Sequence, residues 1–188
     1  GRRKDANKEF KPANIPYILL GAGMLWFGWF GFNAGSALAA NGVAASALVN
    51  TNTASAAAML TWIFYDAAKG KKPSAVGAAI GLVVGLVAIT PAAGFVNVGS
   101  SLFIGVIAAI VSNYAITLRT KSTLDDTLDV FPAHGMGGIV GMLATAVFAN
   151  EVGLIHGETT TFLYHLLALV IVSIFTFGGS LLMYKITD

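Results

Sequence analysis

Residues 15–39, IPYILLGAGMLWFGWFGFNAGSALA, contain no charged side chain. A helix needs roughly 20 mostly apolar residues to cross the hydrocarbon layer of a membrane, so this stretch can span a bilayer. Further apolar runs follow at residues 43–65, 75–93, 99–118, 127–149 and 161–184. The sequence therefore predicts an all-α integral membrane protein with six transmembrane helices, and the short connections predict that neighbouring helices are antiparallel.

The composition supports this prediction. Of the 188 residues, 56% are hydrophobic and 11% charged, with a mean hydropathy of +0.76, whereas an ordinary soluble domain carries about 25% charged residues. A net charge of +2 without a basic stripe gives no indication of a nucleic-acid partner. Because the chain has no cysteine, disulfides, thiolate metal sites and cysteine nucleophiles are excluded.

The basic residues predict the orientation of the helices. Lysine and arginine favour cytoplasmic loops. The connections near residues 40–42, 94–98 and 150–160 contain neither residue. We therefore expect both ends of the segment in the cytoplasm, a plasma (inner) membrane location, a basic segment at residues 1–14 and a six-helix domain at residues 15–188. All eleven basic residues fall on the cytoplasmic side of this arrangement: Arg2, Arg3, Lys4, Lys8, Lys11, Lys69, Lys71, Lys72, Arg119, Lys121 and Lys185.

Small and polar residues inside the spans predict how the helices pack. Gly77, Gly81 and Gly85 recur at four-residue spacing, which allows two helix backbones to approach closely. The run VNTNTASAAAM, residues 49–59, places Asn50, Thr51, Asn52 and Thr53 on the second helix. Unpaired polar groups are costly in hydrocarbon, so we expect these side chains to face neighbouring helices and to hold them together.

The stretch WFGWFGFNAGSA, residues 26–37, carries the first candidate site. Trp29, Phe32 and Ser36 share one helical face, and Ser36 is expected about one turn below the outer end of the helix. Ring faces attract a small cation and a hydroxyl accepts its hydrogen bond, so these residues favour cation recruitment at an outer mouth. The alternative is an aromatic belt at the membrane interface. Glycines in the same run predict tight packing of this helix: Gly28, Gly31 and Gly35.

The stretch DVFPAHGMGGIVG, residues 129–141, carries the second. His134 is an ionisable residue inside an apolar span, which marks a functional candidate, and a neutral imidazole can pass a proton between its nitrogens. The alternative is a structural histidine bonded to a backbone carbonyl. Asp129 is expected to cap the helix that holds His134. His156 and His165 are expected at other depths, so we expect no metal site, and the sequence shows no catalytic set. Close helix approach is also expected at Gly135, Gly137, Gly138 and Gly141.

Several long motifs, taken together, resemble the second half of the ammonium transporter family (Amt/Mep, related to Rh proteins). They occur in the order of the family and extend over roughly residues 10–185: FGWFGFNAGSA, VNTN, GKKPSAVGA, GLVAITPAAG, DDTLDVFPAHGMGGIVG and GGSLLMYKITD. The resemblance implies helices six to eleven of eleven, the second inverted repeat plus the final helix, in a homotrimer with one pore per subunit.

The resemblance also assigns residues. It places Trp29 and Ser36 at the outer ammonium site, Phe32 at the pore closure, Thr90 beside the pore and His134 as the second pore histidine. It implies recruitment of ammonium, loss of a proton and passage of ammonia through a narrow apolar pore, without a cofactor. Pro132, where the family usually has a small or apolar residue, is a departure.

Partners and alternatives follow from the same resemblance. The pore needs an N-terminal five-helix half that this sequence does not contain, so a fragment, a cleaved product, an incomplete chain and a split protein all remain open. Methylammonium is a further candidate substrate and a PII-type protein a candidate regulator, although the tail that contacts it is absent here. A membrane domain of an ammonium sensor and a degenerate structural subunit are the alternative functions.

Overall fold

The computed structural model describes residues 12–122 and 124–187. Within these ranges the chain is helical and contains no strand, and the six predicted spans are confirmed as helices. The helices are α1 (Ile15–Gly35), α2 (Gly42–Ala68), α3 (Ala75–Ile89), α4 (Val98–Thr120), a π-helical segment η1 (Phe131–Met136) continuing into α5 (Gly137–Phe148), a 3-10 turn η2 (Leu154–His156) and α6 (Thr159–Thr187).

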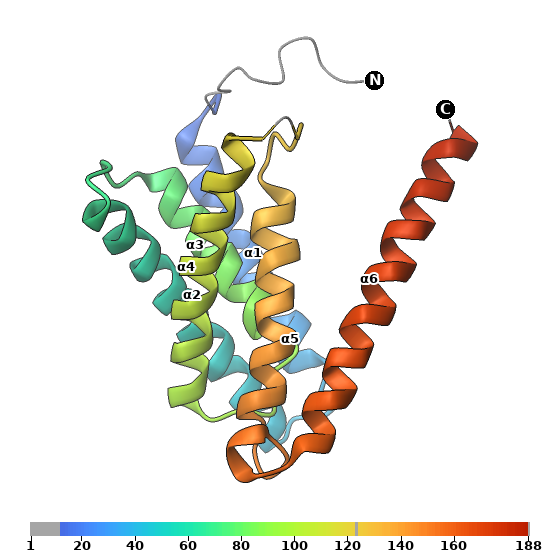
Figure 1. The fold of residues 1–188 in the computed structure, drawn as a ribbon. Helices are drawn as coiled ribbons and strands as arrows, with labels where there is room; N and C mark the ends of the chain where they lie inside the picture. Colours follow the sequence, from blue (N-terminus) through green and yellow to red (C-terminus); the bar gives the residue numbers. More distant parts are fainter. Residues whose placement is uncertain (1–11, 123, 188) are drawn as a thin grey trace.

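Successive helices run up and down and contact their neighbours in sequence, as predicted (Figure 1). Helix α3 occupies the centre of the bundle, where it contacts α1, α2, α4, η1 and α5, and helix α2 contacts α1, α3 and α4. The α2–α3 loop, the α4–η1 loop and the end of α6 lie at the same end as the start of α1 (Figure 1). The basic residues of these segments therefore lie together, while residues 1–11 of the predicted basic segment lie outside the described residues.

Not every helix of the described part is equally suited to cross a membrane. Four are long and apolar enough by themselves: α1, α4, the continuous helix Phe131–Phe148 and α6. Helix α3 is apolar but has only 15 residues. Helix α2 has 27 residues but carries the polar run at its centre; part of its surface packs against α1, α3 and α4, while large side chains such as Leu60 and Phe64 are exposed.

The close contact of α2 with α3 and α4 depends on glycines, which have no side chain, as the glycine spacing predicted. A Cβ atom at Gly85 would lie 2.5 Å from the Ala54 carbonyl oxygen, and one at Gly81 would lie 2.7 Å from Cβ of Trp62. Gly105 of α4 faces the same Ala54 carbonyl. The helix backbones therefore approach more closely than any side chain would allow.

The third helix ends earlier than the predicted boundary at residue 93. Pro91 has no backbone N–H and disfavours helical geometry in the preceding residue, and α3 stops at Ile89. The turn that follows leaves carbonyl groups free, and Asn50 Nδ2 donates to those of Ala93 and Val96, at 2.8 Å each. The polar run on α2 thus bonds to a neighbouring segment, as expected, although Asn52 of that run is exposed.

The glycines of α1 behave differently from those of α3, and the prediction of tight packing there was wrong for this chain. A Cβ atom at Gly28, Gly31 or Gly35 would meet no atom within 4 Å. Glycine permits a close approach but does not supply the neighbour. Helix α6 is similarly uncovered: it contacts only α5 and η2, contains no buried residue, and leans away from the bundle (Figure 1).

Candidate functional site

Three of the predicted site residues meet where α1 crosses the end of α3. The indole Nε1–H of Trp29 donates to Oγ1 of Thr90 at 2.8 Å, although the two residues are 61 positions apart in sequence. The ring of Trp29 contacts that of Phe32 edge-to-face, with centroids 5.9 Å apart and planes at 68°. Such a pair is a favoured aromatic geometry and fixes both rings relative to one another.

Ser36 lies at the end of α1, not one turn below it as expected. The helix stops at Gly35 because the chain turns there, and Ser36 is the residue that caps it. Its Oγ donates to the Phe32 carbonyl at 2.6 Å, so its lone pairs stay available to accept a hydrogen bond. With a rise of about 1.5 Å per residue, Phe32 lies about 6 Å and Trp29 about 10 Å further into the helix.

An apolar groove extends inward along α1 from these rings. It is an open depression of about 600 Å³, lined by α1 alone, and runs from Phe32 and Trp29 past Gly28 and Leu25 to Met24 and Gly21. No residue that lines it carries a charge. A groove of this kind offers nothing to replace the hydration shell of an ion, but a small neutral molecule can occupy it.

His134 lies apart from this group, on the π-helical segment η1. It is exposed on this chain and lines a cavity of about 800 Å³ whose walls also include Phe131, Met136 and Arg119. None of the α1 site residues lines that cavity. A π-helical turn is rare and often occurs at functional sites, so its coincidence with His134 adds to the case for this residue.

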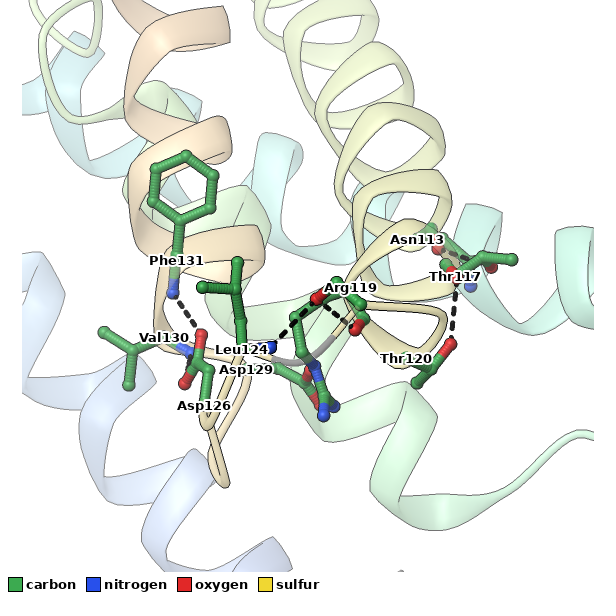
Figure 2. A network of polar contacts seen from close by, with 10 residues as sticks. Asn113, Thr117, Arg119, Thr120, Leu124, Asp126, Asp129, Val130 and Phe131 are labelled. Carbon is green, nitrogen blue, oxygen red and sulfur yellow. Dashed lines mark hydrogen bonds and ion pairs between the residues drawn. The ribbon is translucent and has the colours of Figure 1, made fainter. Parts of the chain in front are cut away.

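Two carboxylates hold the loop before η1. The prediction that Asp129 caps the helix was wrong. Asp126, not Asp129, caps the helix: its two oxygens accept from the backbone N–H groups of Val130 and Phe131, at 2.9 Å each. Asp129 instead has a positive φ of 52° and pairs with Arg119, whose Nε and Nη2 both donate to Oδ1 at 2.9 and 2.5 Å. Figure 2 shows both arrangements side by side.

This loop fixes the start of the helix that presents His134. The acidic run DDTLD, residues 125–129, is visible in the sequence, but spacing alone did not identify which carboxylate reaches the free N–H groups. The left-handed backbone at Asp129 turns its side chain toward α4 and leaves the cap to Asp126. Aspartate is one of the few non-glycine residues that tolerate this conformation.

We expect Asp126→Ala to lower the stability of the purified protein by about 1 to 2 kcal/mol, because two N–H groups lose their acceptor. Asp126→Asn retains one acceptor oxygen and is expected to fall between alanine and the unsubstituted protein. Thermal unfolding in detergent, followed by circular dichroism, measures this order. An alanine variant as stable as the unsubstituted protein would show that this cap contributes nothing.

His165 forms a hydrogen bond to the backbone of α5, and His134 takes no part in it. Its Nδ1 lies 3.1 Å from the Met142 carbonyl oxygen, and since a carbonyl can only accept, the ring N–H donates. This bond joins α6 to α5. A histidine bonded to a carbonyl was the structural alternative for His134, and His165 is the residue that adopts it.

The chain is similar to known proteins over most of its length. A family model described as Ammonium Transporter Family matches residues 1–188. An ammonium transporter of Aquifex aeolicus is 51% identical over 84% of this chain and 38% of its own length. One of Bacillus subtilis is 42% identical over 100% of this chain and 48% of its own.

Solved structures show the same fold. The crystal structure of Candida albicans Mep2 superposes with a TM-score of 0.88 at 36% identity, over 94% of this chain and 41% of that one. A structure titled Sensor Amt Protein superposes with a TM-score of 0.86 at 30% identity, over 95% of this chain and 47% of that one. The chain thus spans less than half the length of these relatives. On the sequence match and the shared fold, this integral membrane chain belongs to the ammonium transporter family.

Proposed function

We propose that the protein containing this chain transports ammonium across the plasma membrane, and that this chain supplies half of the pore. The observation that carries the proposal is the Trp29–Phe32 ring pair, which opens onto the uncharged groove of α1 below Ser36. The relatives named as ammonium transporters support the choice of substrate.

The proposed path begins at the end of α1. Ser36 accepts a hydrogen bond from the ammonium ion at the outer mouth, and the faces of Phe32 and then Trp29 attract the cation. The uncharged groove disfavours the ion, so before it passes further ammonium gives up its proton, which leaves along the route that includes His134. Ammonia then moves through the apolar groove, while the imidazole of His134 carries a proton between its two nitrogens as part of a separate route.

The assembly is part of the proposal. An N-terminal five-helix half covers the faces of α1 and α6 that this chain leaves exposed, and the complete subunits form a homotrimer. Both ends of this segment face the cytoplasm, where a PII-type regulator binds. Two observations support this arrangement. The chain matches less than half of the length of its relatives, and the segments that carry the described basic residues lie at one end of the bundle.

The test uses a completed transporter, in which this chain is fused behind the first five helices of the Aquifex aeolicus relative. Reconstituted in liposomes, it is expected to give an ammonium-evoked current and to take up labelled methylammonium. A protein that binds ammonium without any uptake would support the sensor alternative, which the similarity to the Sensor Amt Protein structure favours.

Ser36→Leu is expected to raise the ammonium concentration for half-maximal current by about tenfold, the effect of losing one hydrogen bond to a charged group. Ser46→Leu, at an exposed serine near the same end of α2, is the matched control and should leave this concentration unchanged. If both variants behave alike, Ser36 has no role in recruitment.

A further inference from the structure

We infer that Thr90 is a positioning residue, which holds the indole of Trp29 at the groove and does not itself donate a hydrogen bond to the molecule that passes. The effect of Thr90 on transport rests on the proposed function, whereas its hydrogen bond to Trp29 does not. The hydroxyl of Thr90 has two hydrogen-bond partners, both inside the protein.

The bonding of Thr90 leaves its only proton unavailable. Oγ1 accepts from Trp29 at 2.8 Å and donates to the Leu86 carbonyl at 2.7 Å. A threonine hydroxyl has one hydrogen, so it cannot also donate to the lone pair of ammonia. The residue is therefore saturated as a donor.

The end of α3 explains why a hydroxyl is present at this position. The backbone N–H of Thr90 donates to the carbonyl of Val87, three residues back, rather than to that of Leu86. The side chain of Thr90 donates to Leu86 instead. Pro91 follows and ends the helix, so the hydroxyl both satisfies the last turn of α3 and points its oxygen at α1.

Trp29 gains a fixed orientation from this bond. The indole N–H is its only polar group. With that group bonded to Thr90, Trp29 presents only ring carbon to the groove and to Phe32. A free N–H there would be a donor that repels ammonium and holds ammonia by its lone pair, and either effect slows passage.

Trp26, on the same helix, provides an internal comparison. Its Nε1 is buried without a hydrogen-bond partner among the described residues, and its ring packs against the α3 side of the bundle. Packing on α3 therefore does not by itself give a tryptophan of α1 a bonded indole. The bond of Trp29 depends on the hydroxyl at position 90.

The first test is spectroscopic and uses the completed transporter labelled with 15N at the tryptophan indoles. Thr90→Val, which replaces the hydroxyl by a methyl group, is expected to shift the Trp29 indole resonance and speed its exchange with water, while the Trp26 resonance stays in place. Thr90→Ser restores the hydroxyl and is expected to restore the Trp29 resonance. An unchanged Trp29 resonance in Thr90→Val, or a serine variant that behaves like valine, overturns the inference.

The second test is transport by the same variants. Thr90→Val is expected to lower the maximal current about 3- to 10-fold, the range for one hydrogen bond, and Thr90→Ser to stay within about twofold. Thr53→Val is the matched control, because Thr53 donates only to the carbonyl of Val49 in its own helix. A shifted Trp29 resonance with unchanged current overturns the positioning role.

A double substitution tests whether Thr90 acts through Trp29. Trp29→Phe removes the indole N–H, so adding Thr90→Val to it should lower the current no further. A further loss of current, additive with the single variants, would show that Thr90 acts independently of Trp29 and would overturn the inference. Absence of any current from the unsubstituted transporter would overturn the proposed function instead, while the Trp29 resonance still decides the geometry.

Discussion

Gly85→Ala is expected to destabilise the protein by about 3 kcal/mol or more, even though alanine is the better helix former. The added Cβ would lie 2.5 Å from the Ala54 carbonyl oxygen and 2.6 Å from Cα of Ser55. Both atoms belong to the backbone of α2, so no side-chain rotation relieves the contact and the two helices must separate. Their separation also breaks the 2.9 Å bond from Ser55 Oγ to the Leu82 carbonyl.

The matched control is Gly138→Ala on α5, where a Cβ atom meets nothing within 4 Å. Helix propensity alone favours alanine by about 1 kcal/mol, so this variant is expected to be neutral or more stable. Thermal unfolding in detergent and the monodisperse fraction on gel filtration measure both. Equal stability of the two variants would show that α2 and α3 are not in close backbone contact.

The success of the glycine prediction on α3 and its failure on α1 have one physical cause. The spacing of glycines shows that one face of a helix lacks side chains, but it does not show which element packs against that face. For Gly85 the neighbour is α2, within this chain. For Gly28 no neighbour belongs to the described residues. A sequence pattern therefore predicts packing only where the partner is also in the sequence.

The helices themselves could be predicted because a run of about 20 apolar residues matches the length of a helix that crosses the hydrocarbon layer of a membrane. Their ends could not, since they depend on local chemistry that competes with hydropathy. Pro91 ends α3 four residues early, and the left-handed Asp129 delays the start of η1 to Phe131.

The candidate site was only partly predictable. The family resemblance assigned Trp29 and Thr90 separately, but no spacing rule joins residues 61 positions apart by a specific hydrogen bond. Helix periodicity correctly put Phe32 beside Trp29. It did not give the cap at Ser36, because the position of the helix end was unknown.

His134→Ala is expected to abolish the ammonium-evoked current of the completed transporter, or to reduce it by about 100-fold or more. Groups that transfer protons contribute about 10²- to 10⁴-fold to a reaction, and alanine has no group that can do so. His134 lines its cavity from η1, and the loop held by Asp126 and Asp129 fixes where η1 begins. Current and uptake of labelled methylammonium, measured together, separate loss of proton movement from loss of all flux.

His156→Ala is the matched control, because His156 is exposed on the η2 turn, in the connection before α6, and the proposed path does not include it. It should retain the full current. If current is lost but uptake persists, His134 serves the proton route and the groove of α1 conducts the neutral molecule without it. If both are lost, the imidazole is needed for passage itself. An unchanged current in His134→Ala would remove His134 from the pore.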